Sequence, residues 1–174
     1  MKRLFIIRHA KSSWKDVTLD DFDRPLNKRG KKDAPFMAKL LKDKSIYPDL
    51  ILSSPATRAK VTAITIAKEL DMEEKIVFKE RIYESSLSTL INCLKKADDT
   101  NQIIFIIGHN PSLNALAYEF VDFDENIPTM GIVEIKFNVN NWKDINENNA
   151  SLISFEYPKK HKNKWGLNET YSNR

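Results

Sequence analysis

The 174-residue sequence contains one cysteine, Cys93, and only four glycines. A single cysteine excludes an intrachain disulfide and a cysteine cluster for zinc or an iron–sulfur group. The glycines form neither the Gly-x-x-x-x-Gly-Lys-[Ser/Thr] pattern nor the Gly-x-Gly-x-x-Gly pattern, so a nucleotide P-loop and a dinucleotide site are unsupported. A phosphate group bound by this chain would have to be held by side chains.

Long hydrophobic runs are also missing. No apolar run approaches the ~20 residues that span a bilayer, and the four apolar residues after residue 3 are too few for a secretory signal. We therefore expect a cytoplasmic protein without a membrane partner. The net charge of +4 is modest and lies partly in residues 159–164, so a nucleic-acid partner is not expected. The sequence indicates no particular oligomeric state.

The regular elements that are present follow a repeated order of short apolar strand, turn and helix. The predicted strands are residues 3–7, 49–53, 75–78 and 102–107, and the helical patterns after them cover residues 28–44, 55–70, 87–97 and 111–120. Strands that alternate with helices predict an α/β fold with a mainly parallel sheet. The fourth strand is the most apolar and is expected at the centre of this sheet.

Two of the predicted helices have similar start signals. Ser54 and Asn110 are expected as N-caps, each followed by a proline at the first helical position. In the helix of residues 28–44, Pro35 either kinks the helix or marks a restart with Asp33 as its cap.

The C-terminal part has a different pattern. Residues 133–139 and 153–157 alternate between apolar and polar side chains, which predicts an antiparallel pair at the sheet edge, joined by a polar loop. We expect one domain over residues 1–158 and a solvated basic tail over residues 159–174, in which His161 has no function.

Basic side chains follow three of the predicted parallel strands at the point where each strand ends. They are Arg8 and His9 after the first strand, Arg58 in the first helical turn after the second, and His109 after the fourth. Carboxyl ends of parallel strands meet at one sheet edge, so these side chains should converge. Guanidinium groups and helix N-termini favour phosphoryl oxygens, which predicts a phosphate site.

Three kinds of phosphatase nucleophile can be compared. Cys93 lies in a helical stripe without an arginine a few residues later, which argues against a cysteine enzyme. No apolar strand leads into Asp21 or Asp23, as it would for an aspartate nucleophile that uses magnesium. A histidine remains, and the positive charges of Arg8 and Arg58 should keep His9 neutral with a free ring nitrogen.

Four motifs in sequence order carry a resemblance to a known family. They are Arg8-His9-Ala10, Arg24-Pro25-Leu26-Asn27-Lys28-Arg29-Gly30, Ser53-Ser54-Pro55-Ala56-Thr57-Arg58-Ala59 and Gly108-His109-Asn110. Together they resemble the histidine phosphatase superfamily, and most closely its small branch, the SixA-like phosphohistidine phosphatases. The match extends over about residues 1 to 140.

The resemblance implies a phosphoglycerate mutase-like, three-layer α/β/α fold. It also implies that His9 accepts the phosphoryl group, that a pocket of Arg8, Arg58 and His109 holds it, and that no metal or other cofactor is used. Ser12 and Asn110 are candidates for substrate binding. The sequence departs from the wider family at Ala10, where glycine is common, and at Lys15, where many members have an asparagine.

The proton donor is less well defined, because larger family members carry a glutamate in an insertion. Glu84 and Asp16 are the candidates here. Breaking a P–N bond to imidazole demands less of an acid than expelling an alkoxide, which favours phosphoramidate substrates. The expected activity is phosphohydrolysis of a protein phosphohistidine or a small phosphorylated molecule. The alternatives are a phosphomonoesterase for small metabolites and a non-catalytic module that binds a phosphorylated ligand.

Overall fold

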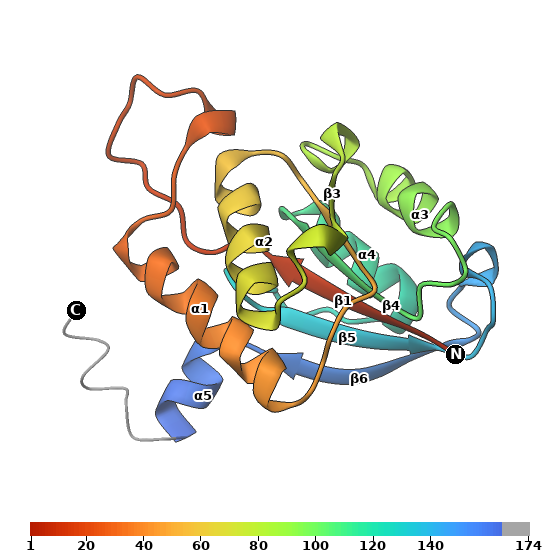
Figure 1. Cartoon of the computed structure of the whole chain (residues 1–174). Coiled ribbons are helices and arrows are strands. Elements are labelled where there is room, and N and C mark those ends of the chain that lie inside the picture. Colours follow the sequence, from red (N-terminus) through yellow and green to blue (C-terminus); the bar gives the residue numbers. More distant parts are fainter. Residues whose placement is uncertain (165–174) are drawn as a thin grey trace.

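A six-stranded sheet forms the centre of the computed structural model, which describes residues 1–164 (Figure 1). The strands are β1 (Lys2–Arg8), β2 (Leu50–Ser53), β3 (Ile76–Phe78), β4 (Ile103–Gly108), β5 (Ile132–Phe137) and β6 (Ala150–Glu156). Their order across the sheet is β3-β2-β4-β1-β5-β6. The apolar strand β4 is therefore central, as its composition predicts.

The sheet is parallel on one side and antiparallel on the other. Strands β3, β2, β4 and β1 are parallel neighbours, whereas β5 pairs antiparallel with both β1 and β6. This confirms the predicted α/β fold with a mainly parallel sheet and an antiparallel pair at the sheet edge. Consequently the carboxyl ends of β1, β2 and β4 lie side by side at one edge of the sheet.

Helices cover both faces of the sheet and give the expected three-layer α/β/α fold. They are α1 (Lys28–Asp43), α2 (Thr57–Leu70), α3 (Leu87–Lys95), α4 (Ser112–Val121) and α5 (Pro158–Lys164), with short 3-10 turns η1 (Asp21–Asp23), η2 (Glu73–Lys75), η3 (Glu80–Ile82) and η4 (Trp142–Asp144). Side chains of α1 and α2 pack on one face, and those of α3 and α4 pack on the other. Figure 1 shows α1 and α2 in front of the sheet and α4 behind it.

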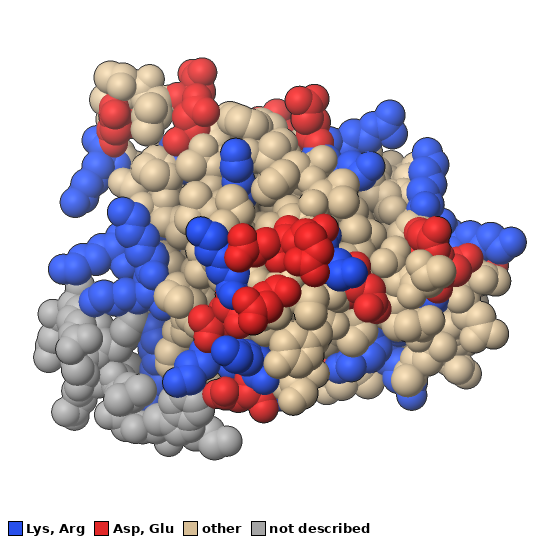
Figure 2. Space-filling view, in the orientation of Figure 1, with Lys and Arg blue, Asp and Glu red and all other residues tan. Residues whose placement is uncertain are grey.

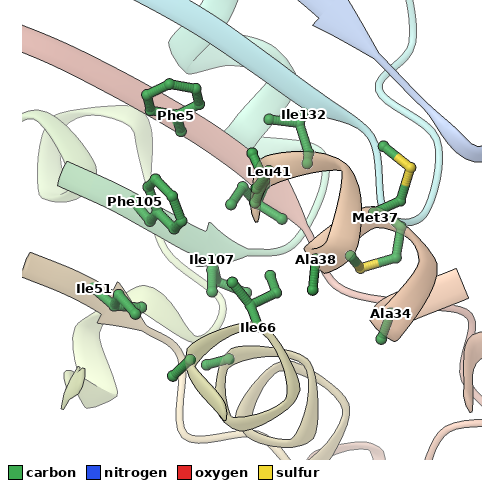
Figure 3. Packing of buried hydrophobic residues seen from close by; sticks show 14 of the residues in the cluster. Phe5, Ala34, Met37, Ala38, Leu41, Ile51, Ile66, Phe105, Ile107 and Ile132 are labelled. Carbon is green, nitrogen blue, oxygen red and sulfur yellow. The ribbon is translucent and has the colours of Figure 1, made fainter. Parts of the chain in front are cut away.

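Alternate strand residues contribute to two separate cores. Phe5, Ile51 and Phe105 point toward α1 and α2, where Figure 3 shows them beside Ile66 and Leu41. The intervening residues of the same strands point to the other face, which is why these strands are apolar along their whole length. Two filled cores hold the strand ends, and the side chains attached to them, in fixed positions.

The helices begin differently from the sequence prediction. Helix α2 begins at Thr57 and not at Pro55, because Ala56, with a ψ of 140°, is not helical and occupies the N-cap position. Helix α4 begins at Ser112 with Pro111 at its N-cap position, so Asn110 does not occupy that position. Helix α1 is continuous through Pro35 and is capped by Asn27, whose side chain accepts a hydrogen bond from the Gly30 amide.

The expectation of a solvated tail is wrong for its first residues. Residues 158–164 form α5, and His161 and Lys162 are buried. Lys162 is hydrogen-bonded to the buried carboxylate of Asp33 in α1, and His161 to Glu156. Asp33 thus binds α5 and caps no helix. The rest of the predicted tail, residues 165–174, lies outside the described residues. None of the described helices is long and apolar enough to cross a membrane.

Candidate active site

His9 lies directly beyond the end of β1, between neighbouring strands. Its backbone N–H donates to the carbonyl oxygen of Gly108 at 3.1 Å, which continues the pairing of β1 with β4. Its side chain is only 7% exposed, and Nδ1 lies 2.7 Å from the carbonyl oxygen of Ala10. Arg8, the last residue of β1, donates from Nη1 to the carbonyl oxygen of Ile127 at 3.0 Å.

Arg58 is the second residue of α2 and is buried. A threonine one turn later connects this helix to the His9 segment. The hydroxyl of Thr62 donates to the carbonyl oxygen of Arg58 at 2.7 Å and accepts from the amide of Ala10 at 3.0 Å. The backbone beside His9 is therefore fixed to the first turn of α2. No sequence signal predicts this function of Thr62, because threonine is common on helices.

His109 follows β4 and completes the group predicted from the strand ends. Its imidazole ring lies 5.1 Å from that of His9, centre to centre. Its Nε2 atom is 2.8 Å from the hydroxyl oxygen of Ser54, and that oxygen accepts a hydrogen bond from the Ala56 amide. Ser54, predicted as a helix cap, instead orients His109.

Both histidines are neutral at ordinary pH. Burial is the main cause that lowers the pKa of His9 to about 3, and the charges of Arg58 and Arg8 lower it further against the opposing hydrogen bond to Ala10. Burial also lowers the pKa of His109 to about 4, with Arg58 as the next cause. A neutral His9 was predicted from the arginines, but removal from water contributes more.

Three buried nitrogen atoms around the two histidines have hydrogen-bonding capacity that the protein does not use. Among the described residues, Nε of Arg8, Nε of Arg24 and Nδ1 of His109 are buried without a hydrogen-bond partner. A buried donor left without a partner costs about 1–3 kcal/mol of stability, which a bound acceptor recovers. Two of these atoms belong to residues predicted to bind a phosphoryl group.

A carboxylate lies between the arginines. Asp21 in η1 accepts hydrogen bonds from Nη2 of Arg58 at 3.0 Å and from the hydroxyl of Tyr83 at 2.7 Å. It also accepts from Nη1 of Arg24 at 3.3 Å. From the sequence, Asp21 is a candidate only for an aspartate nucleophile. No spacing rule connects a loop aspartate to a tyrosine 62 residues later.

The sequence is similar to a family of known proteins. Residues 4–97 match the family model of the histidine phosphatase superfamily (branch 1). The chain belongs to this superfamily. A chloroplastic protein of Arabidopsis thaliana is 31% identical over 152 residues, which cover 82% of this chain and 70% of that protein.

Solved structures place the chain in the SixA-like branch of the superfamily. The structure of a candidate phosphohistidine phosphatase SixA from Agrobacterium tumefaciens is 28% identical, with a TM-score of 0.78, and the match covers 90% of this chain and 98% of that one. The protein histidine phosphatase SixA in complex with tungstate has the same fold, with a TM-score of 0.79 at 19% identity over 92% of this chain and 99% of that one. The protein is thus a phosphatase that acts on a phosphorylated substrate.

The remaining residues predicted for this histidine phosphatase have other contacts. Ser12 is buried and accepts a hydrogen bond from Arg24. Asn110 donates to the carbonyl oxygen of Ile127 at 3.0 Å, so it supports the loop that Arg8 also contacts. Asp16 is exposed and accepts from the hydroxyl and the amide of Thr18 at 2.6 and 3.0 Å. Glu84 is exposed, with a φ of 52°.

Possible metal ligands were examined in the same region. Across residues 1–164, no group of three or more histidine, cysteine, aspartate or glutamate side chains is arranged to hold a metal ion. The positive charges close to the two histidines come from arginines, and arginine cannot ligate a metal.

Proposed function

We propose that the protein is a metal-independent phosphohydrolase that acts through a phosphohistidine intermediate on His9. The observation that supports this most strongly is the pair of buried, unpartnered nitrogen atoms, Nε of Arg8 and Nδ1 of His109, near the neutral His9 ring. When the Ser54 hydroxyl donates to Nε2 of His109, Nδ1 carries the proton and both nitrogen atoms are donors. A neutral imidazole has a lone pair with which to attack phosphorus. The donors and the Arg58 guanidinium are arranged to bind the phosphoryl oxygens.

The reaction takes place in two displacements. In the first, the unprotonated ring nitrogen of His9 attacks the phosphorus, a P–N bond forms, and the bond from phosphorus to the leaving group breaks. In the second, water attacks the phosphorus and the bond to His9 breaks, which releases inorganic phosphate and the neutral imidazole. Charge in each transition state spreads over the equatorial oxygens, which Arg8, Arg58 and His109 stabilise.

The leaving group must gain a proton, and Glu84 and Asp16 remain the candidate donors. Hydrogen bonds from the side chain and backbone of Thr18 lower the pKa of Asp16, so this group is an ionised carboxylate at neutral pH and has no proton to donate. A leaving imidazole needs less help than an alkoxide. This supports phosphohistidine in a protein as the substrate, in preference to a phosphomonoester of a small metabolite.

The test is a substrate panel and a phosphate-trapping assay on three proteins. Wild type should hydrolyse phosphoramidate and phosphohistidine faster than phosphomonoesters, without loss of activity in a chelator. It should form a phosphoenzyme that is labile in acid and stable in alkali. The His9→Ala variant should lose the trapped phosphate and about 1,000-fold or more in kcat/KM.

A matched control is available because the chain has a third histidine. His161 lies in α5 against Glu156, so His161→Gln should retain the trapped phosphate. Turnover that survives in His9→Ala, or that requires magnesium, contradicts the proposal. Stoichiometric binding of vanadate or phosphate without hydrolysis of any substrate in the panel contradicts it as well.

A further inference from the structure

Asp21 is held at the pocket by more contacts than a loop carboxylate needs. Besides the bonds to its carboxylate, its backbone carbonyl oxygen accepts from Nη1 of Arg58 at 2.6 Å. Both terminal nitrogens of Arg58 are therefore bound to one residue. The Asp21 side chain is nevertheless 45% exposed, so it lies at the opening of the pocket and not beneath it.

The carboxylate of Asp21 is ionised at neutral pH. Partial burial opposes ionisation, but the hydrogen bonds from Tyr83 and Arg58 outweigh it and lower the pKa of Asp21. Burial and the bond to Asp21 raise the pKa of Tyr83 to about 12, so its hydroxyl keeps the proton that it donates. The opening of the pocket thus carries a fixed negative charge.

The charges around the pocket match one phosphoryl group. The charged side chains that act on His109 are Arg8, Arg24 and Arg58, together with Asp21. Both histidines are neutral, so these four side chains carry a net charge of +2, which a phosphoryl dianion balances. A second anionic group on the same substrate would find no positive charge left over and would approach Asp21.

The segment that carries Asp21 also contains Asp16, Asp20 and Asp23, together with Lys11 and Lys15, all exposed. Among the described residues, the structure shows no hydrogen bond or ion pair between these five side chains and the arginines, whereas Asp21 is bonded to Arg58 and Arg24. In Figure 2 acidic side chains are visible on this projecting segment at the upper left, whereas the flank of α1 below it is mainly basic. A leaving group that extends toward solvent past Asp21 meets the negative charge of this carboxylate.

We propose that Asp21 determines substrate specificity by disfavouring leaving groups that carry a carboxylate near the phosphate. Phosphoryl compounds with a neutral or cationic leaving group, such as a phosphorylated imidazole or amine, are favoured over anionic ones. This inference rests on the proposed function, because it concerns the leaving group in the same pocket. At an effective dielectric constant of about 40, which suits a partly exposed side chain, charges about 6 Å apart interact strongly enough to change selectivity about tenfold.

The test uses two phosphoesters that differ by a single carboxylate, O-phosphoethanolamine and O-phosphoserine. Wild type should prefer phosphoethanolamine in kcat/KM, and Asp21→Asn should reduce this preference about tenfold. Two control variants separate charge from structure. Asp20→Asn removes the same charge from an exposed neighbour that makes no cap hydrogen bond, and Tyr83→Phe removes the hydroxyl bond but leaves the charge of Asp21. Both should retain the wild-type ratio within twofold.

Affinities of the same two esters for the His9→Ala protein, with and without Asp21→Asn, give a second measurement that needs no turnover. A shift of the affinity ratio toward phosphoserine supports the specificity proposal even if wild type hydrolyses neither ester. Failure of the proposed function would appear separately, as no hydrolysis of phosphoramidate, phosphohistidine or any other substrate in the panel. An unchanged ratio in Asp21→Asn, or an equal change in Asp20→Asn, overturns the specificity proposal. Thermal melting confirms that each variant is folded.

Discussion

Nδ1 of His9 lies 2.7 Å from the carbonyl oxygen of Ala10, and a carbonyl oxygen can only accept. Nδ1 of the neutral ring therefore carries the proton, and Nε2 keeps the lone pair. A contact within two consecutive residues thus selects the atom that attacks phosphorus in the proposed reaction.

The first prediction concerns the position of the phosphate on His9. The trapped phosphoenzyme should carry phosphate on Nε2 and not on Nδ1, because the Ala10 carbonyl occupies Nδ1. Nuclear magnetic resonance of the ¹⁵N-labelled phosphoenzyme distinguishes the two isomers. Phosphate on Nδ1 would show that the imidazole ring flips and exposes Nδ1 before it reacts.

The second prediction concerns the orientation of His109. Ser54→Ala removes the hydroxyl at 2.8 Å from Nε2 of His109 and should lower kcat/KM about tenfold, since one hydrogen bond contributes about 1 kcal/mol. Ser53→Ala is the control, because that buried hydroxyl bonds to the carbonyl oxygens of Ser54 and Ala59. Steady-state kinetics of both variants should show a loss for Ser54→Ala alone, and equal losses would assign Ser54 a purely structural function.

The third prediction is a dependence of stability on pH. The pKa values of His9 and His109 are about 3 and 4 in the folded protein, against 6.5 for a free side chain. Below pH 6.5 the unfolded chain binds protons at these rings that the folded protein does not. The free energy of unfolding should thus fall by about 1.6 kcal/mol per ring from pH 6.5 to 5. Urea titrations should show a smaller fall in His9→Gln, and an equal fall would mean that His9 is not buried as a neutral ring.

The fourth prediction concerns Gly30 in the first turns of α1. A glycine-to-alanine change inside a helix normally stabilises by up to about 1 kcal/mol. Here a Cβ would overlap the carbonyl oxygen of Lys11, two residues after His9. We therefore expect Gly30→Ala to destabilise the protein by about 1–3 kcal/mol and to reduce activity. Thermal unfolding and kinetics test this, and a gain in stability would contradict it.

The fifth prediction concerns the attachment of α5. Lys162→Met leaves the buried carboxylate of Asp33 without this partner and should lower the free energy of unfolding by about 3 kcal/mol. Lys160→Met, which removes an exposed ion pair with Glu156, should cost less than about 1 kcal/mol. Equal losses of unfolding free energy in urea titrations would show that the buried pair stabilises the protein no more than the exposed pair does.

The sequence by itself determined the strands, their parallel arrangement and the group of Arg8, His9, Arg58 and His109. Hydrophobic periodicity reports which face of an element is buried, and parallel strands necessarily bring their carboxyl ends to one edge. The predicted helix N-caps were less reliable, since Ser54 contacts His109 and begins no helix.

Tertiary structure alone decided which side chains from distant segments meet. Asp21 contacts Arg58, which lies 37 positions later, and Tyr83, which lies 62 positions later. Lys162 contacts Asp33, which lies 129 positions earlier. Such contacts depend on the path of a polar loop and of the chain terminus, which have no periodic pattern to reveal their direction. The proposed nucleophile could therefore be selected from the sequence, whereas the carboxylate that contacts Arg58 could be found only in the folded protein.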